Sequence, residues 1–343
     1  MKKKIVIVSS LDNKEQRGGA YLRVHAIETL YQNLGFNTEI IYQENIQYQT
    51  TFSSYLSLLK FGKLPFLLFK KASVQLPPHD YLHLDNLRHF NWEFNSDAPV
   101  LFNAHNLEFE NYYNRSSGFF AKNFQNWEIS QYRKAKCVWV CSEREKEILV
   151  SLSPDLKEKI LVIPNLVNKS DYYSSPKKYI SFIGTLDYYP NQFAVKFILE
   201  NLTEISSDYE LLIAGRNPLP EQIEQCEKMG VTLKTNLSQA EIQKIFSETK
   251  ILLVPLEHGS GTRLKIVEAI FSNAQVLSTS LGAEGIESKE IMISDLKDFS
   301  KNLNKILKRE FGQDGADQNF SEQFDIQSWN KVYGNTLKGM IEA

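Results

Sequence analysis

The sequence predicts an α/β protein with two doubly wound parallel sheets, and three observations support this fold class. Short β-rich runs alternate with amphipathic helical patterns along the whole chain. Such alternation is typical of parallel sheets covered by helices on both faces. A polar, turn-rich segment at 166–176 separates two series of runs of similar length. The chain has 343 residues, which is enough for two domains of ordinary size.

The predicted strands are apolar runs bounded by polar or turn-forming residues. In the first half they are Ile5–Ser9, Thr38–Tyr42, Tyr81–Leu84, Val100–Ala104, Cys137–Cys141 and Ile160–Ile163. In the second half they are Tyr179–Ile183, Glu210–Ala214, Val231–Lys234, Ile251–Val254, Val276–Thr279 and Ile291–Ile293. Amphipathic patterns between them predict helices, for example over Tyr21–Leu34, Gln192–Leu202 and Gln239–Ser247.

Composition excludes several classes of protein. The formal net charge is −2 and the pI is near 6.4, which argues against a nucleic-acid-binding surface. The three cysteines show neither a disulfide framework nor zinc-ligand spacing, so a reducing compartment is expected. The apolar run at the N-terminus is too short for a signal peptide, and no run is long enough for a transmembrane helix. We therefore expect a cytoplasmic protein.

The most informative segment is a strand, a small-residue loop and a helix in succession. The strand is Ile251–Val254, the loop is Gly259–Thr262, and apolar residues at helical spacing follow. Backbone N–H groups at the start of a helix favour an anion. Arg263 and Lys265 add positive charge there, where cations are unfavourable unless an anion compensates them, and Glu268 can accept hydrogen bonds from hydroxyls. A diphosphate attached to a ribose fits this set.

Two doubly wound domains imply a central cleft, with ligands at the carboxyl ends of the strands. The loops to search therefore include Gly18-Gly19, His105 and Gly184. Asp85 also follows a predicted strand, and we expect it to meet an acceptor. The remaining histidines form no cluster with cysteines, so we expect loop or acceptor-side positions and no metal for His79, His83 and His89.

Four motifs in the second half resemble a known family: IGTLDYYPN (183–191), IAGRNP (213–218), PLEHGSGTRLKIVEAI (255–270) and STSLGAEGI (278–286). Together they are similar to the C-terminal domain of GT-B glycosyltransferases, and most similar to the retaining glycosyltransferase family 4 (glycosyl transferases group 1). The first half is similar in outline, through Gly18-Gly19, AHNLE (104–108) and CSEREKEIL (141–149).

The resemblance implies two Rossmann-like domains facing a central cleft. The N-terminal, acceptor-side domain would span 1–165 and the linker 166–176. The C-terminal, nucleotide-sugar-binding domain would span 177–325. Residues 326–343, with Trp329, Val332, Tyr333 and Leu337, would form a helix that packs back on the first domain.

The resemblance also implies roles for individual residues. Arg263 and Lys265 would hold the donor diphosphate, Glu268 the ribose hydroxyls, and His105 would face the transferred sugar. Further donor contacts would come from Ser260, Gly261, Thr262, Gly19 and Gly184. Two departures stand out: Ser260 occupies the position of the family's first glutamate, eight residues before Glu268, and Thr185 follows Gly184 where a basic residue is common.

The expected function is therefore a retaining glycosyltransferase that moves a sugar from a nucleotide-diphosphate sugar to a glycan or lipid-linked acceptor. No Asp-x-Asp pair occurs, so no metal or other cofactor is expected. A nucleotide-sugar epimerase or phosphorylase of the same fold, and a degenerate binding protein without catalysis, are the alternatives. The basic and aromatic segment Phe52–Phe69 fits either a buried helix or peripheral contact with the inner face of an anionic membrane.

Overall fold

The computed structural model describes residues 2–9, 11, 18–47, 70–113, 118–205, 208–258, 263–308 and 316–343. The chain divides into two compact units. The first comprises Met1–Leu166 and Trp329–Ala343, and the second comprises Val167–Ser328. Each unit contains a six-stranded sheet in which all neighbouring strands are parallel, so the predicted α/β class is confirmed.

The sheet of the first unit has the strand order β2-β1-β4-β6-β7-β8. Its strands are β1 (Lys4–Val8), β2 (Asn37–Ile41), β4 (Tyr81–Leu84), β6 (Val100–Asn103), β7 (Cys137–Val140) and β8 (Ile160–Val162). The chain first moves from β1 to β2 on one side and then crosses to β4 on the other side of β1. The loops that follow β1 and β4 therefore leave the sheet at its topological switch point, where ligands commonly bind in open α/β sheets.

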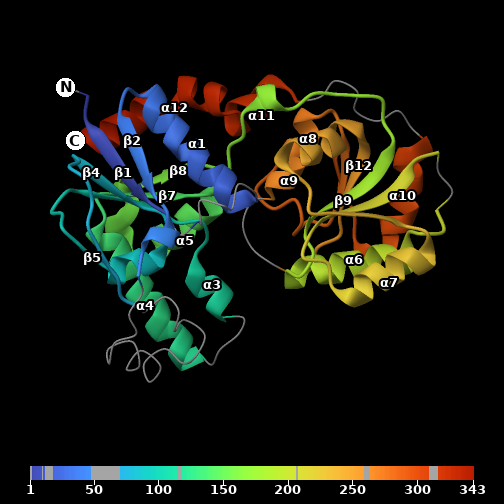
Figure 1. Ribbon diagram of the computed structural model, residues 1–343, viewed down its shortest axis with the longest axis horizontal. Coiled ribbons are helices and arrows are strands. Elements are labelled where there is room, and N and C mark those ends of the chain that lie inside the picture. The colour runs from blue at the N-terminus through green and yellow to red at the C-terminus, as the bar shows by residue number, and fades with distance from the viewer. Residues whose placement is uncertain are drawn as a thin grey trace. The chain divides into compact units, whose positions relative to one another are not determined.

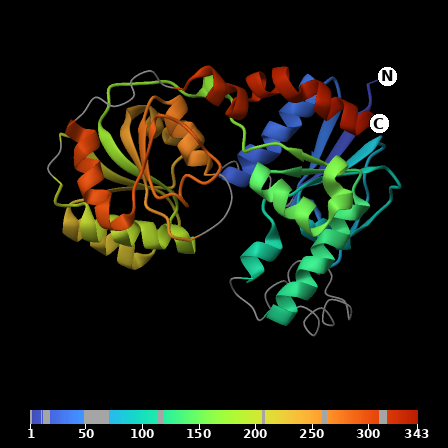
Figure 2. The same cartoon turned by 180° about the vertical axis from the view of Figure 1, so that it is seen from behind.

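Helices cover both faces of this sheet (Figures 1 and 2). On one side lie α1 (Gly19–Asn33) and α12 (Ile326–Glu342), and on the other lie α4 (Gly118–Lys134) and α5 (Glu143–Leu152). The short α3 (Glu108–Tyr113) follows β6. The last turns of α12 reach the sheet, because the Sγ atom of Cys137 lies 3.2 Å from the carbonyl oxygen of Met340.

The sheet of the second unit has the strand order β11-β10-β9-β12-β13-β14. Its strands are β9 (Tyr179–Thr185), β10 (Glu210–Arg216), β11 (Thr232–Thr235), β12 (Thr249–Val254), β13 (Gln275–Ser278) and β14 (Ile291–Ile293). Here the switch point lies between β9 and β12. The predicted donor-binding segments follow these two strands.

Figure 1 shows α6 and α7 on one side of the second sheet and α8 and α9 on the other. The helices of this unit are α6 (Tyr189–Asn201), α7 (Pro220–Met229), α8 (Gln239–Glu248), α9 (Leu264–Phe271), α10 (Phe299–Lys308) and α11 (Gln318–Phe324). The helix α9 is short and almost wholly buried, which suits the apolar pattern of its sequence. Its N-cap is Arg263, which follows directly after the predicted loop.

Several local features differ from or extend the sequence-based expectations. A separate parallel pair forms between β3 (Ser73–Val74) and β5 (Glu93–Phe94). Part of the segment predicted as a linker forms a short 3₁₀ helix, Lys169–Asp171, followed by the buried Tyr172. The segment Phe52–Phe69 lies outside the described residues. None of the helices in the described residues combines the length and the apolar character that a membrane span requires.

Candidate functional site

The second unit gathers positive charge at the carboxyl edge of its sheet. Lys265 lies in the first turn of α9, and its Nζ atom is 4.3 Å from the ring centroid of Phe182. The same Nζ donates a hydrogen bond of 3.5 Å to the side-chain oxygen of Asn191. Burial, followed by the nearby charge of Arg263, lowers the pKa of Lys265 to about 7, whereas Glu268 opposes this shift. A lysine in such a place gains its full charge when an anion joins it.

Gly184 leaves space beside this lysine. A Cβ atom added at Gly184 would lie 2.8 Å from Nδ2 of Asn191 and 3.3 Å from Nζ of Lys265. Asn191 is itself held in place, because its Nδ2 donates a hydrogen bond of 2.8 Å to the carbonyl oxygen of Thr185. A side chain at position 184 would therefore displace the groups that surround the lysine, which is a close backbone approach that favours glycine.

Two arginines lie near the same edge. Arg263 caps the start of α9, and burial lowers its pKa, although the neighbouring Tyr188 and Glu284 act in the opposite direction. Arg216 ends β10, and its Nε donates a hydrogen bond of 3.3 Å to the hydroxyl of Thr185. Arg263 and Lys265 follow β12 in the chain, and Arg216 ends β10, which pairs with β9. The strands β9 and β12 are the two that flank the switch point of the second sheet. This arrangement suits a ligand with more than one negative charge.

Glu268 lies one turn further along α9 and is only 7% exposed. Its Oε1 accepts a hydrogen bond of 2.8 Å from the hydroxyl of Tyr172, which is 8% exposed. Burial raises the pKa of Glu268 to about 7, and the hydrogen bond from Tyr172 and the charge of Lys265 act against this rise. The sequence-based reasoning missed Tyr172, because it belongs to the polar segment that was interpreted as a linker.

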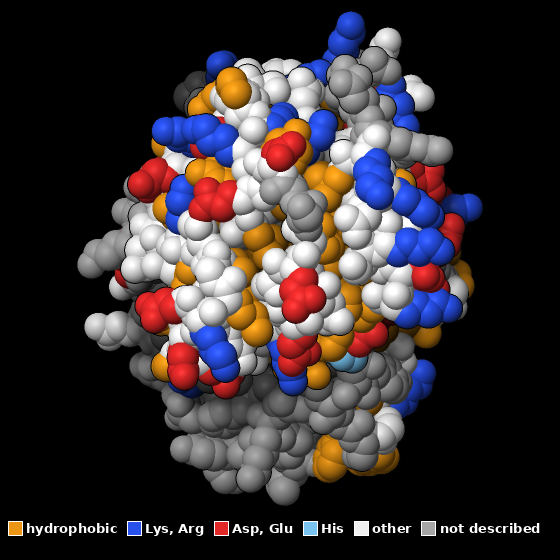
Figure 3. Space-filling model, turned by 90° about the vertical axis from the view of Figure 1, so that its right-hand side faces the viewer, with side chains coloured by type: hydrophobic (Ala, Val, Ile, Leu, Met, Phe, Trp, Pro, Cys, Tyr) orange, Lys and Arg blue, Asp and Glu red, His pale blue; other side chains and the backbone are white. Residues whose placement is uncertain are grey.

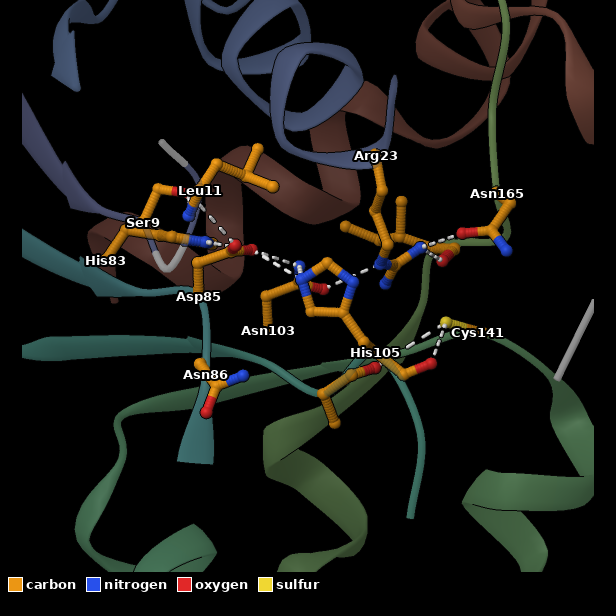
Figure 4. Close-up of polar contacts among 12 residues, drawn as sticks. Ser9, Leu11, Arg23, His83, Asp85, Asn86, Asn103, His105, Cys141 and Asn165 are labelled. Atoms are coloured by element: carbon orange, nitrogen blue, oxygen red, sulfur yellow. Dashed lines mark hydrogen bonds and ion pairs between the residues drawn. The ribbon is translucent and has the colours of Figure 1, made fainter. Parts of the chain in front are cut away.

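The first unit carries a second polar cluster at the carboxyl edge of its own sheet (Figure 4). Asp85 follows β4 and His105 follows β6, and Nε2 of His105 lies 2.9 Å from Oδ1 of Asp85. The side chain of His105 is 19% exposed, whereas that of Asp85 is 1% exposed. The expectation that Asp85 itself meets an acceptor is wrong, since its carboxylate is buried and bonded within the protein.

His83 and His89 are not acceptor-side residues either, whereas His79 lies in a loop, as predicted. His83 is buried on β4, and its Nδ1 lies 2.8 Å from the hydroxyl of Tyr31. His89 is wholly buried beside Trp92, with ring centroids 4.3 Å apart. Burial lowers the pKa of His83 to about 4 and that of His89 to about 3, so both are neutral at physiological pH. They are core histidines.

The glycine pair of the first unit opens α1. Gly18 is the N-cap with a φ of 96°, a backbone conformation that favours glycine. Gly19 begins the helix, and a Cβ atom added there would meet no atom within 4 Å. The requirement for glycine at position 19 therefore does not come from packing among the described residues.

Three of the predicted donor contacts, Ser260, Gly261 and Thr262, lie outside the described residues. Within the described ranges, no group of three or more His, Cys, Asp or Glu side chains could hold a metal ion. Acidic and basic side chains both occur across the face of the molecule shown in Figure 3, with several Lys and Arg side chains at its right-hand edge.

This chain is similar in sequence to one protein family and in structure to several solved proteins. Residues 177–309 match the family model described as Glycosyl transferases group 1. The chain is similar to the Anabaena protein HepE, whose crystal structure contains UDP and glucose, with 12% identity, a TM-score of 0.66 and coverage of 98% of this chain and 100% of HepE. Sucrose-phosphate synthase from Thermosynechococcus elongatus is similar at 13% identity and a TM-score of 0.67, with the same coverage of 98% and 100%.

The fold is GT-B. A Listeria monocytogenes protein provisionally described as a UDP-N-acetylglucosamine 2-epimerase shares it, with 11% identity, a TM-score of 0.61 and coverage of 100% of this chain and 98% of that protein. A curated Klebsiella pneumoniae relative, an uncharacterized 44.6 kDa protein in the cps region, is 26% identical over 148 residues. That match covers 38% of this chain and only 37% of the relative's length.

Proposed function

We propose that this protein is a retaining, metal-independent glycosyltransferase that moves a sugar from a nucleotide-diphosphate sugar to a glycan or lipid-linked acceptor. The observation that carries the proposal is the partly buried Lys265, with a pKa lowered to about 7, on the first turn of α9 beside Arg263. The match of residues 177–309 to Glycosyl transferases group 1 supports it. So does HepE, which shares the fold and has been crystallised with UDP-glucose.

The donor contacts follow from the chemistry of the side chains. Lys265 and Arg263 bind the diphosphate, and Gly184 leaves room for it near the lysine. Glu268, whose Oε1 is engaged by Tyr172, accepts a hydrogen bond from a ribose hydroxyl. From the first unit, we propose His105 as a contact of the transferred sugar and Gly19 as a contact of the phosphates. Ser260, Gly261 and Thr262 complete the donor contacts.

In the proposed reaction, the bond between the anomeric carbon and the diphosphate oxygen breaks while a bond to the acceptor oxygen forms on the same face. The proton of the acceptor hydroxyl passes to an oxygen of the departing phosphate. Negative charge accumulates on that phosphate in the transition state, and the two cations of α9 stabilise it there. No metal is required for this charge compensation.

The proposal includes the biosynthetic role of the protein and the compartment in which it acts. The cps region from which the Klebsiella relative takes its name supports a role in polysaccharide biosynthesis. All three cysteines of this chain are free and buried, which is compatible with the reducing cytoplasm. We place the protein in the cytoplasm, with nucleic acid excluded as a partner. Peripheral contact with the inner face of the membrane is the arrangement that a lipid-linked acceptor would require.

The test begins with a thermal-shift panel of uridine, guanosine and adenosine diphosphates and their sugars, because selective binding to the native state raises Tm. Transfer from the selected donor to glycan and lipid-linked acceptors is then measured, and NMR establishes the anomeric configuration of the product. Arg263→Ala should lower turnover by roughly 10²–10³-fold, whereas Lys234→Met serves as a control at β11. Inversion of configuration would reject the retaining mechanism, and the absence of transfer with every donor would reject the glycosyltransferase.

An epimerase is the second candidate, because the Listeria protein shares the fold over the whole chain. Incubation with donor alone separates the two. An epimerase converts one sugar nucleotide into another without an acceptor, and a binding protein leaves every donor unchanged. A phosphorylase releases sugar phosphate from a glycan only when inorganic phosphate is added, because phosphate cleaves the glycosidic bond.

A further inference from the structure

Asp85 has a fixed environment that determines which nitrogen of His105 carries the hydrogen. The Oδ1 atom of Asp85 is 2.9 Å from Nε2 of His105 and accepts a hydrogen bond of 2.7 Å from Nδ2 of Asn103. Its Oδ2 accepts a longer hydrogen bond of 3.4 Å from the hydroxyl of Ser9. Both oxygens of the carboxylate are therefore engaged inside the unit, and Asp85 can influence a substrate only through His105.

Arg23 determines how the amide of Asn103 is oriented. The Nε atom of Arg23 lies 2.9 Å from Oδ1 of Asn103. Because a guanidinium only donates hydrogen bonds, the amide oxygen must face Arg23 and the NH₂ group must face Asp85. The same guanidinium donates to the carbonyl oxygen of Ile163 at 2.8 Å, which fixes its own position. Figure 4 shows this chain of contacts running from Arg23 through Asn103 to Asp85.

The charge of Asp85 determines which nitrogen of His105 carries the hydrogen. Burial alone would raise the pKa of Asp85, but the charge and hydrogen bond of His105 and the hydrogen bond from Asn103 lower it below its ordinary value. Asp85 is therefore ionised at neutral pH and can only accept hydrogen bonds. Nε2 of His105 lies 2.9 Å from this carboxylate and 3.3 Å from Nδ2 of Asn103. The shorter contact, to a charged acceptor, places the hydrogen of a neutral His105 on Nε2, which leaves the lone pair of Nδ1 available to an external donor.

We propose that Asp85 is a positioning residue that holds His105 in the Nε2–H tautomer, so that Nδ1 accepts a hydrogen bond from a hydroxyl of the transferred sugar. The identity of this hydroxyl-bearing ligand rests on the proposed glycosyltransferase function, whereas the tautomer depends only on the first unit. The hydrogen bond orients the sugar while its anomeric carbon reacts. Loss of Asp85 should therefore lower kcat more than it raises KM for the donor.

The tautomer is measured on the unaltered protein by ¹⁵N NMR of its histidine rings, with the signals of His105 assigned by comparison with His105→Gln. The expected result is a protonated Nε2 and an unprotonated Nδ1 at pH 8. A protonated Nδ1 with a bare Nε2 would overturn the proposal, whether or not the protein transfers sugar. This measurement also does not depend on the folding of any variant at Asp85.

Kinetics then test the positioning role in a double-mutant cycle of Asp85→Asn and His105→Ala. Each single substitution should lower kcat by ~10- to 100-fold, the scale of one strong hydrogen bond, and the double variant should be no slower than His105→Ala alone. Asp155→Asn, which alters an exposed carboxylate paired with Arg133, is the matched control. Additive losses, or turnover of Asp85→Asn within a few-fold of the parent, would contradict the proposal. Absence of transfer by the parent would instead contradict the proposed function and leave the NMR result to decide the tautomer.

Discussion

Binding of a diphosphate should make Lys265 take up a proton. Its pKa is about 7 in the ligand-free protein, so about nine tenths of the lysine is neutral at pH 8 by the ordinary titration relation. An adjacent diphosphate favours the charged form and should return the pKa toward its usual value near 10.5. We therefore expect uptake of roughly 0.9 proton at this residue per UDP bound at pH 8, and an affinity that falls by up to about tenfold per pH unit above 7.

Isothermal titration calorimetry measures this uptake directly. UDP is titrated at pH 8 in two buffers with different heats of ionisation, and the difference in apparent binding enthalpy gives the number of protons. Lys265→Met should abolish the uptake and weaken binding. Lys234→Met is the matched control, because it also removes a lysine near an aromatic ring, with Nζ 4.8 Å from the centroid of Tyr179, and proton uptake should be unchanged.

The same substitution has a second expected effect, on stability. Between pH 7 and pH 10.5 the unfolded chain binds more protons at Lys265 than the folded protein, so the contribution of this residue to stability rises with pH in that window. At pH 7 and below, the charged lysine destabilises the ligand-free fold, and Lys265→Met should raise Tm. Equal proton uptake by the parent and Lys265→Met would refute the reasoning, as would a lower Tm for the variant at pH 6.

Three further substitutions test the geometry around the candidate site. Tyr172→Phe removes the hydrogen bond to the buried Glu268 and should lower the free energy of unfolding by about 1–2 kcal/mol at pH 8, measured with urea; an unchanged value would show that the bond contributes nothing. Gly184→Ala should cost about 1–3 kcal/mol, because its Cβ would lie 2.8 Å from Nδ2 of Asn191, and a Tm equal to that of the parent would contradict this packing. Gly19→Ala should leave Tm unchanged, since its Cβ meets no atom within 4 Å, yet weaken donor binding in calorimetry; unaltered affinity would remove this glycine from the proposed donor site.

Most of the sheet structure could be predicted from sequence because the central strands are buried on both faces. Runs such as Ile251–Val254 and Cys137–Cys141 are uniformly apolar, and the observed strands lie within one or two residues of the predicted bounds. The strands β3 and β5 have only two residues each, which is too short for any periodicity to emerge. Parallel order also explains why strand ends were the right places to look for polar clusters.

The pairing of side chains was less predictable, for reasons that the contacts make clear. Tyr172 and Glu268 are separated by 96 positions in the chain, and no local pattern marks a hydroxyl in a polar segment as the partner of a buried carboxylate. Asp85 and His105 both follow strands, so their proximity could have been anticipated from the sheet. The burial of Asp85 could not, because it depends on how Ser9, Asn103 and Arg23 close around it.

The return of the chain to the first unit at Trp329 has a consequence for synthesis and dissection of the protein. Residues 167–328 form one uninterrupted stretch and can be excised as a single fragment, whereas the first unit combines two separate segments, 1–166 and 329–343. During translation, residues 167–328 are made before Trp329–Ala343, so the second unit can complete its contacts while the first still lacks this segment. The first unit is therefore the later of the two to be completed, and removal of Trp329–Ala343 should destabilise the unit that contains residues 1–166.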